Sequence, residues 1–259
     1  MSVIYGVVFC LLLGYIGYRF RLLTVSGSLF TVVVGSLVLA GFGYPGLVML
    51  MLFFGSSSLL SKLGKRRKQS VDQIVEKDGP RDGWQVLANG GIAALASIGF
   101  SWTEHTSFLV LFLVVLAASN ADTWASEIGP LSKKDPFLFT GRRVPAGTSG
   151  AVSFLGTSAT IVGALFIATA GDLLFDLPTG TWLLIAAGGI VGSMLDTLFG
   201  GTVQRKFRCV VCSKETEKRR HHDQPTLYLK GWKWLGNDAV NFLSSTLAGM
   251  IGFIGHRMW

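Results

Sequence analysis

The chain has 259 residues, of which 50% are hydrophobic and only 15% are charged, and its mean hydropathy is +0.50. A water-soluble domain of this size carries more charge, so the composition excludes an ordinary soluble enzyme and indicates an integral membrane protein. The three cysteines exclude a disulfide framework, because Cys10 lies in the first apolar run while Cys209 and Cys212 share a basic loop.

Eight apolar stretches are long enough to cross a bilayer once tilt and short helices are allowed. The first stretch has no basic residues before it and no small-residue cleavage site after it, so we expect a retained span and not a cleaved signal peptide. We therefore predict one all-α membrane domain over residues 1–259. It is expected to be a polytopic bundle of about eight transmembrane helices, near 3–18, 28–44, 46–61, 84–102, 106–121, 151–170, 181–199 and 238–255.

The basic residues are distributed unevenly between the loops. When the loops are placed alternately on two sides, all Lys and Arg residues except Arg257 fall on one side. Basic loops remain in the cytoplasm, so we predict cytoplasmic loops at about 62–84, 122–150 and 199–237 and both termini on the non-cytoplasmic side. The net charge of +8 follows from this topology and from attraction to anionic lipid. Because no RNA- or DNA-binding motif accompanies the basic loops, we expect the lipid bilayer as a partner and no nucleic acid.

Polar residues recur at helical spacing within four of the predicted spans, always at the cytoplasmic end. Ionisable groups at membrane depth are costly, so they are expected to face one another or a wet cavity. The alternative is that each Asp marks a helix end and that the Ser and Asn side chains only hold the bundle together. Agreement among the four spans favours a shared polar chamber, made of Gln85, Asn89, Ser119, Asp122, Ser126, Ser193, Asp196, Asn237, Asp238 and Asn241.

The loop before the sixth predicted span contains Arg142 and Arg143, followed by the run Gly147, Thr148, Ser149 and Gly150. Exposed N–H groups at a helix start bind anions, and arginines match phosphate oxygens, so this loop is a candidate phosphate site at the start of the sixth helix. An ordinary helix cap is the alternative. Mg²⁺ is held by carboxylates together with substrate phosphates, which makes Asp122, Glu127 and Asp196 candidate magnesium ligands and catalytic residues.

The last basic loop contains Cys209 and Cys212 at Cys-x-x-Cys spacing, followed by His221 and His222. Two thiolates and one or two imidazoles can form a tetrahedral zinc site. The two histidines are adjacent, however, so both rings reach one ion only if the backbone turns sharply. The alternative is a basic loop with reduced thiols whose histidines contact phosphates or lipid headgroups.

Five segments together resemble a membrane family that includes chloroplast phytyl-phosphate kinase and uncharacterised multi-pass proteins of bacteria, archaea and animals. They are QVLANGG (85–91), SNADTWASEIGPLS (119–132), VPAGTSGAVSFLGT (144–157), GSMLDTLFGGTVQ (192–204) and WLGNDAVNFLSS (234–245). The resemblance implies a polyprenyl-phosphate kinase that uses a nucleoside triphosphate, with CTP as the expected donor. The blocks 122–129 and 142–148 are also similar to the CTP-site pattern of dolichol and phytol kinases.

The sequence therefore predicts a CTP-dependent, or other nucleotide-dependent, kinase that converts an isoprenoid monophosphate such as phytyl or geranylgeranyl phosphate to the diphosphate. Its site faces the cytoplasm and uses Mg²⁺. A transporter or channel is the alternative, because intramembrane acids and the repeated Ser-x-x-Asp-Thr at 119–123 and 193–197 are equally expected there. A non-catalytic scaffold is a third. Glycines in the helices permit close packing within one chain or between two, so a homodimer is compatible with the sequence.

Overall fold

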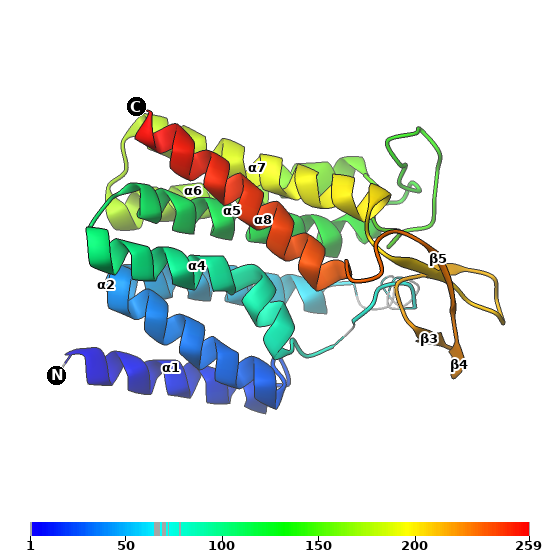
Figure 1. Ribbon diagram of the computed structural model, residues 1–259, viewed down its shortest axis with the longest axis horizontal. Coiled ribbons are helices and arrows are strands. Elements are labelled where there is room, and N and C mark those ends of the chain that lie inside the picture. The colour runs from blue at the N-terminus through cyan, green and yellow to red at the C-terminus, as the bar shows by residue number, and fades with distance from the viewer. Residues whose placement is uncertain (1, 65–67, 69–70, 72, 78, 259) are drawn as a thin grey trace.

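The computed structural model describes residues 2–64, 68, 71, 73–77 and 79–258. Part of the predicted 62–84 loop, namely 65–67, 69–70, 72 and 78, therefore lies outside the described residues. The described chain is mainly helical and packs as one bundle (Figure 1). The helices are α1 (Ser2–Arg19), α2 (Val25–Lys62), α4 (Gly83–Thr103), α5 (Ser107–Ile128), the short 3-10 helix η1 (Gly129–Leu131), α6 (Phe154–Phe175), α7 (Thr179–Thr202) and α8 (Asn237–Arg257).

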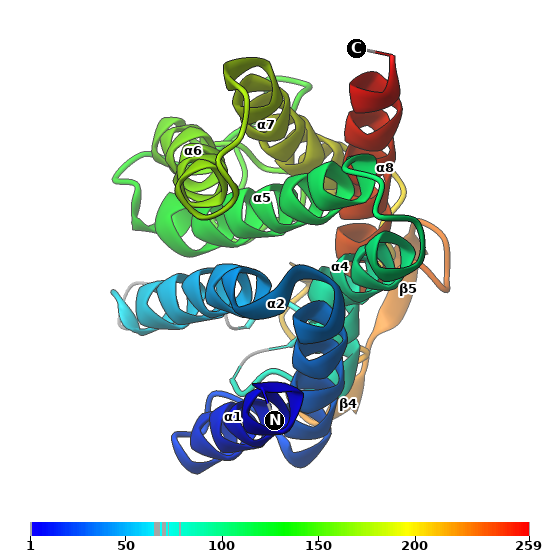
Figure 2. The same cartoon turned by 90° about the vertical axis from the view of Figure 1, so that its left-hand side faces the viewer.

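Six described helices, α2 and α4 to α8, are long and apolar enough to cross a membrane, and α1 is a shorter apolar helix. The predicted spans 28–44 and 46–61 both lie within α2, which has 38 residues. Gly43 inside α2 has a φ of 63° and a ψ of −157°, and Pro45 follows two residues later. A left-handed glycine and a proline interrupt regular helical hydrogen bonding. The two parts of α2 consequently run in clearly different directions (Figure 2).

Helix α5 is the centre of the bundle. It contacts α2, α4, α6, α7 and α8, and its residues from Val110 to Ala121 are all buried. Figure 2 shows α5 between α6 and α7 on one side and the second part of α2 on the other. Small residues bring the neighbouring helices close: a Cβ atom on Gly192 of α7 would lie 2.4 Å from the Cβ of Ala118. This packing carries the polar residues at the end of α5 into the middle of the bundle.

The two ends of the bundle differ in their connections. Both termini lie at one end, whereas the 129–153 loop, the 203–236 segment and all strands lie at the other (Figure 1). The sequence places most of the basic loop residues at this second end. We call it the basic end.

The expectation of an all-α chain is wrong for the last basic loop, which contains five short strands. Strand β1 (Lys206–Arg208) pairs antiparallel with β2 (Glu215–Thr216) and β5 (Leu227–Lys230), and β3 (Arg220–His221) pairs antiparallel with β4 (Gln224–Pro225). Phe207 is opposite Thr216 on one side and Tyr228 on the other. The strands have only two to four residues, too few for an alternating sequence pattern to mark them.

Candidate active site

A cavity of about 710 Å³ opens at the basic end, between the ends of α4, α5, α6, α7 and α8. A second, much smaller pocket adjoins this cavity and is lined by residues that include Asn89, Ser119, Asp122, Asp196 and Asn241. Most residues predicted for the chamber and the phosphate site therefore lie together, although their roles stay predictions. Those lining the main cavity are Gln85, Asn89, Asp122, Ser126, Glu127, Gly147, Thr148, Ser149, Gly150, Ser193, Asp196, Asn237, Asp238 and Asn241.

Two carboxylates lie at the floor of the cavity, Asp122 on α5 and Asp196 on α7. They are close enough for the negative charge of Asp122 to act on Asp196. Among the described residues, the Asp122 carboxylate has no hydrogen bond and no ion pair. Two neighbouring buried carboxylates repel each other when both are ionised, so a bound cation would be needed to stabilise the charged pair.

The Asp196 carboxylate is held by α8. The hydroxyl of Ser244 donates a hydrogen bond to Asp196 Oδ2 at 2.9 Å. The amide orientation of Asn241 that satisfies its surroundings also directs Nδ2 to Asp196 Oδ2 at 3.0 Å, and to the main-chain oxygen of Asn237 at 3.2 Å. Both bonds to the carboxylate use the same oxygen. Helix α8 therefore fixes Asp196 while its other oxygen points away from these donors.

Most other charges around the cavity are already paired. Lys68 is buried, and its Nζ lies 2.5 Å from Glu127 Oε2 and 2.9 Å from the main-chain oxygen of Leu60. Lys77 lies 2.5 Å from Asp238 and 2.7 Å from Asp82. Glu127 and Asp238 are thus neutralised by lysines, which distinguishes them from Asp122.

Lys77 also joins two helices. Burial lowers the pKa of Lys77, but its contacts with Asp238 and Asp82 outweigh this and raise that pKa above its ordinary value. Asp82 is the N-cap of α4, where its side chain accepts from the N–H of Gln85 in a capping box. It follows that Asp82 fixes the start of α4 and does not line the main cavity.

Arg81 is a partly buried cation at the cavity wall. Its main chain bonds to the segment after α1, with the Arg81 N–H donating to Leu22 at 2.9 Å and the Arg81 oxygen accepting from Thr24 at 3.0 Å. Its guanidinium lies 5.2 Å from the centre of the Phe54 ring. Burial lowers the pKa of Arg81, and the charge of Glu127 opposes this; a guanidinium remains protonated even so. No carboxylate of the described residues forms an ion pair with Arg81.

The 147–150 turn lines the cavity, but it does not open the sixth helix as expected. Helix α6 begins at Phe154, and Ser153 is its N-cap, with its hydroxyl accepting from the N–H of Gly156 at 3.1 Å. Gly147 and Gly150 have φ angles of 88° and 79°. A Cβ atom on Gly150 would lie 2.2 Å from the Cα of Gly201, at the end of α7. The glycines therefore form a separate tight turn against α7, which the sequence pattern did not distinguish from a helix start.

The hydroxyls of this turn are used inside the protein. Thr148 donates both its N–H and its hydroxyl to the main-chain oxygen of Pro145, at 3.2 and 2.7 Å. Ser149 donates its hydroxyl to the carboxylate of the buried Glu217. Main-chain N–H groups are consequently what the turn can offer to an anion.

Arg142 and Arg143 are exposed and are not among the described residues that line the cavity. Both lie in the 129–153 loop, where Arg143 forms an antiparallel β-bridge with Phe137. Of the described basic residues, those at the cavity wall are Lys68, Lys77 and Arg81. The geometry thus offers other cations for phosphate binding than the two arginines named from the sequence.

Residues of the strand segment hold the glycine turn in place. Lys206 on β1 is buried and donates from Nζ to the main-chain oxygen of Ser149 at 2.9 Å, while Glu217, just after β2, accepts from the Ser149 hydroxyl. Burial lowers the pKa of Lys206 and raises the pKa of Glu217. Ser149 therefore lies between a buried cation and a buried acid of the 203–236 segment.

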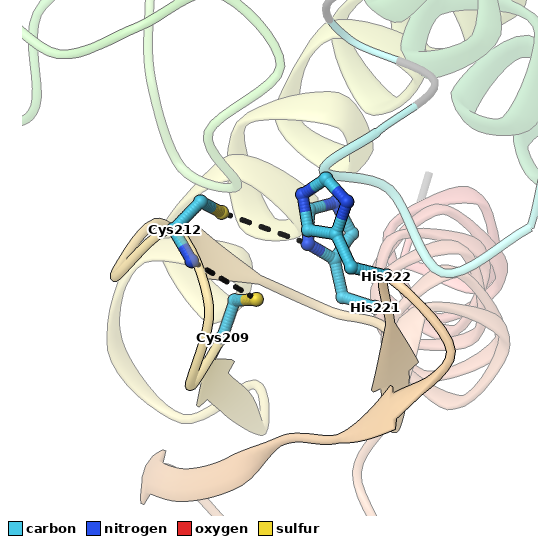
Figure 3. Close-up of side chains that lie close together, drawn as sticks. All are labelled: Cys209, Cys212, His221 and His222. Atoms are coloured by element: carbon cyan, nitrogen blue, oxygen red, sulfur yellow. Dashed lines mark hydrogen bonds between the residues drawn. The ribbon is translucent and has the colours of Figure 1, made fainter.

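The four predicted zinc ligands also come together, but outside the cavity. The ligand atoms of Cys209, Cys212, His221 and His222 all lie within 4.8 Å of one another. Figure 3 shows their side chains directed toward a common point, with Cys212 Sγ 3.7 Å from His221 Nδ1. This cluster and the carboxylates at the cavity floor are separate sites.

A family model described as integral membrane protein DUF92 matches residues 8–249 of the chain. The chain belongs to the DUF92 family of integral membrane proteins. This match and the relatives below confirm the family resemblance drawn from the five sequence segments.

Relatives of this DUF92 chain occur in plants and archaea. It is 31% identical over 286 residues to Protein PGR of Arabidopsis thaliana, covering 96% of this chain and 94% of that protein. It is 34% identical over 241 residues to an uncharacterized membrane protein of Methanocaldococcus jannaschii, covering 90% of this chain and 86% of that protein. It is 24% identical over 240 residues to the chloroplastic Protein VTE6 of Arabidopsis thaliana, covering 90% of this chain and 65% of that protein. No solved structure matches the chain.

Several residues at the DUF92 cavity were not expected from the sequence. In the sequence, Lys68 and Arg81 stand out only as basic residues of the loop before α4, and Glu217 lies within a run of charged residues. For Arg81, the one feature of the sequence that indicates a place near the cavity is its position directly before the capping box of α4. No comparable pattern marks Lys68 or Glu217, because their positions depend on how the loops fold over the cavity.

Proposed function

We propose that this DUF92 protein is a phosphotransferase that adds the terminal phosphate of a nucleoside triphosphate, CTP by preference, to an isoprenoid monophosphate. The observation that carries this proposal is the pair Asp122 and Asp196 at the floor of a cavity whose wall also holds a glycine turn and Arg81, a cation that forms no ion pair with a described carboxylate. Acids and cations in one cavity match a substrate that carries phosphates and a divalent cation together.

We assign Asp122 and Asp196 as the ligands of Mg²⁺. Their donor chemistry fits, because hard cations prefer carboxylate oxygens and neither carboxylate forms an ion pair with a described residue. Bound there, Mg²⁺ would neutralise charge on the transferred phosphate. Asn241 and Ser244 hold Asp196 in position through Oδ2, which leaves Oδ1, among the described contacts, for the metal. Glu127 is assigned to position Lys68.

Arg81, Lys68 and the main-chain N–H groups of Gly147, Ser149 and Gly150, which have no partner among the described residues, are assigned to the phosphates. Arginine binds phosphate oxygens through two parallel hydrogen bonds. Gly147 and Gly150 allow the backbone of the turn to approach an anion without a side chain in between. These groups act by holding charge and position, which is what phosphoryl transfer mainly requires.

In the reaction, an oxygen of the isoprenoid monophosphate forms a new bond to the γ-phosphorus of the nucleotide. The bond from that phosphorus to the oxygen bridging the β-phosphate breaks, and the nucleoside diphosphate leaves with the electron pair. A phosphate monoester has a second pKa of about 6, so near neutrality the attacking oxygen is already largely deprotonated. No residue of the site is required to remove a proton, and a strong general base is unnecessary.

The cavity also reaches the apolar surface of the bundle. Ile161 on α6 and Ile190 and Met194 on α7 line it, and Ile161 and Met194 are 42% and 57% exposed. An exposed apolar side chain on a spanning helix faces lipid. Tail access between α6 and α7 would keep an isoprenoid chain in the bilayer while its phosphate reaches Asp122 and Asp196.

We further propose eight membrane crossings, in which the two parts of α2 cross separately. The basic end then faces the cytoplasm, or the equivalent side of an organelle membrane, and both termini face the opposite side. The concentration of Lys and Arg in the loops of the basic end supports this orientation. The cavity consequently opens where nucleoside triphosphates are found.

The family supports the choice of a lipid phosphate as substrate. The sequence segments resemble a family that includes chloroplast phytyl-phosphate kinase, and a chloroplastic protein, VTE6, is among the relatives. Three of the five segments contain the cavity residues Asn89, Asp122 and Asp196.

The test uses the purified full-length protein in detergent or liposomes with Mg²⁺, phytyl or geranylgeranyl monophosphate, and each nucleoside triphosphate labelled at the γ-phosphate. The proposal expects label to appear in the isoprenoid diphosphate, and to be lost in Asp122→Asn and Asp196→Asn. Asp172→Asn is a matched control, because Asp172 lies near the other end of α6 and outside the cavity lining.

The alternative function gives a different result in the same preparation. No diphosphate with any nucleotide, together with ion flux in liposomes that depends on Asp122 and Asp196, would contradict the kinase and favour a transporter or channel. The location of the acids at one end of the bundle argues for the kinase, since transporters place such groups near the midplane with access from both sides.

A further inference from the structure

We propose that Cys209, Cys212, His221 and His222 bind one Zn²⁺ ion that serves a structural role, by fixing the strand segment that holds the glycine turn of the cavity. Such a site would be independent of the reaction assigned to the cavity. Two hairpin ends bring the four ligands together (Figure 3).

The first hairpin end, between β1 and β2, carries the two cysteines. The N–H groups of Val211 and Cys212 both donate to Cys209 Sγ, at 3.3 and 3.5 Å. The turn is closed by the Cys209 N–H donating to Lys214 and by the Ser213 N–H donating to Cys209, both at 3.0 Å. Main-chain N–H groups directed at a sulfur stabilise a thiolate, the form of cysteine that binds metal.

The second hairpin end, between β3 and β4, carries the two histidines. His222 and Asp223, its two central residues, have φ angles of 53° and 58°. Two successive positive φ angles make the tight turn typical of two-residue hairpins. This turn removes the objection that adjacent histidines cannot face one ion, and the ring centres of His221 and His222 lie 4.2 Å apart.

The spacing of the four ligand atoms suits a tetrahedral ion. Zn–S bonds of about 2.3 Å and Zn–N bonds of about 2.0 Å place tetrahedral ligand atoms roughly 3.3 to 3.8 Å apart. The described ligand atoms lie within 4.8 Å of one another, and the Cys212 to His221 distance is already 3.7 Å. Two thiolates would balance the charge of Zn²⁺ within a loop that is otherwise rich in Lys and Arg. With four protein ligands the ion has no open position, so its role is structural.

The strand segment connects this cluster to the cavity. Thr216 on β2 donates to the main-chain oxygen of Ile74 at 2.9 Å, and the N–H of Glu217 donates to the same oxygen at 2.8 Å. Glu217 and Lys206 then hold Ser149 of the glycine turn. Since β1 and β2 have only three and two residues, we infer that the metal stabilises their hairpin and thereby Glu217 and Lys206.

The experiment measures zinc in the purified full-length protein, prepared without chelators, by plasma mass spectrometry. We expect about one zinc per chain, and a loss of at least about tenfold in the Cys209→Ser/Cys212→Ser double variant. Cys10→Ser is the matched control, because Cys10 is buried in α1 and is expected to leave the zinc content unchanged. Zinc-free wild-type protein, or a double variant that retains its zinc, would overturn the proposal.

A second measurement does not depend on whether the double variant folds. In wild-type protein, a zinc-selective chelator should make Cys209 and Cys212 reactive toward a thiol reagent and speed proteolysis within 203–236, while Cys10 stays unreactive. Cobalt added after chelation should give the visible absorption of tetrahedral sulfur ligation. Thiols that react equally before and after chelation, or a Cys209–Cys212 disulfide in freshly purified protein, would contradict a zinc site.

Discussion

The two clusters of candidate metal ligands differ in how far apart their members lie in the sequence. Cys209 and His222 mark the limits of one short segment, and two hairpin turns suffice to bring its ligands together. Asp122 and Asp196 lie on α5 and α7, and Asn241 and Ser244 reach Asp196 from α8. The nitrogen and sulfur cluster can therefore form locally, whereas the carboxylate floor exists only when the bundle is assembled.

The two clusters also differ in their surroundings, because one is open and the other is closed. The carboxylates face a cavity with room for a substrate, while the cysteines and histidines face one another. An open site with oxygen ligands suits a metal that takes part in a reaction, and a closed site with sulfur and nitrogen ligands suits a structural metal. If the two roles are distinct, a change at one metal site should leave the metal at the other site in place.

The largest expected effect is at the floor of the cavity. Asp122→Asn and Asp196→Asn should each lower kinase activity at least about 100-fold, because even changes in the outer shell of a metal site lower function roughly 10- to 100-fold. Zinc content should not change. The measurement is label transfer to the isoprenoid diphosphate with zinc analysis on the same samples, and loss of zinc in these variants would show that the sites are not separable.

The next largest effect is expected at the 147–150 turn, which lines the cavity and is held by Glu217 and Lys206 of the strand segment. In Gly150→Ala the new Cβ meets the Cα of Gly201 and the φ of 79° is unfavourable, so we expect activity to fall about tenfold or more. Gly141→Ala is the matched control, since Gly141 has a φ of 78° in the same loop but nothing within 4 Å of an added Cβ. Equal activity of the two variants would show that the close approach of the turn to α7 is unimportant.

A smaller effect is expected when the zinc is removed from wild-type protein. Because Glu217 and Lys206 act on the turn from outside the metal floor, activity should fall partially, and the temperature of unfolding should decrease. Addition of zinc after the chelator should restore both. The measurement combines thermal unfolding with the label-transfer assay, and complete inactivation without a change in unfolding temperature would indicate that this metal takes part in the reaction.

The smallest effect concerns the lipid side of the cavity. Met194→Trp should raise KM for the isoprenoid phosphate, because the larger side chain would narrow the entry between α6 and α7, and should leave KM for the nucleotide unchanged. Leu183→Trp, at an exposed position on the same helix away from the cavity, is the control. A rise in KM for the nucleotide alone would contradict tail access between α6 and α7.

The positions of the helices could be predicted from the sequence because apolar length follows bilayer thickness. Segments 84–102 and 181–199 match α4 and α7 within a few residues. The polar stripe on each helix could also be predicted, because helical periodicity fixes which side chains share a face. The stripes of α4, α5, α7 and α8 accordingly place Asn89, Asp122, Asp196 and Asn241 around one small pocket.

The remainder depends on contacts that no local pattern contains. Hydropathy cannot show that the backbone changes direction at Gly43 within α2, or that α6 begins at Phe154. The pairing of Lys68 with Glu127 depends on how the loop after α2 folds over the cavity. For the same reason Arg142 and Arg143 were expected at the cavity and Arg81 was not, although all three are arginines in basic loops.

The most direct test of the account is binding of Mn²⁺, a spectroscopically visible substitute for Mg²⁺, measured by electron paramagnetic resonance on purified protein with a nonhydrolysable nucleotide. If Asp122 and Asp196 bind the metal, the wild-type protein should bind Mn²⁺, and Asp122→Asn and Asp196→Asn should each lose it. Binding should be retained in Asp172→Asn and in Cys209→Ser/Cys212→Ser. Unchanged Mn²⁺ binding in both floor variants would contradict the assignment of Asp122 and Asp196 as the metal ligands of a phosphotransferase.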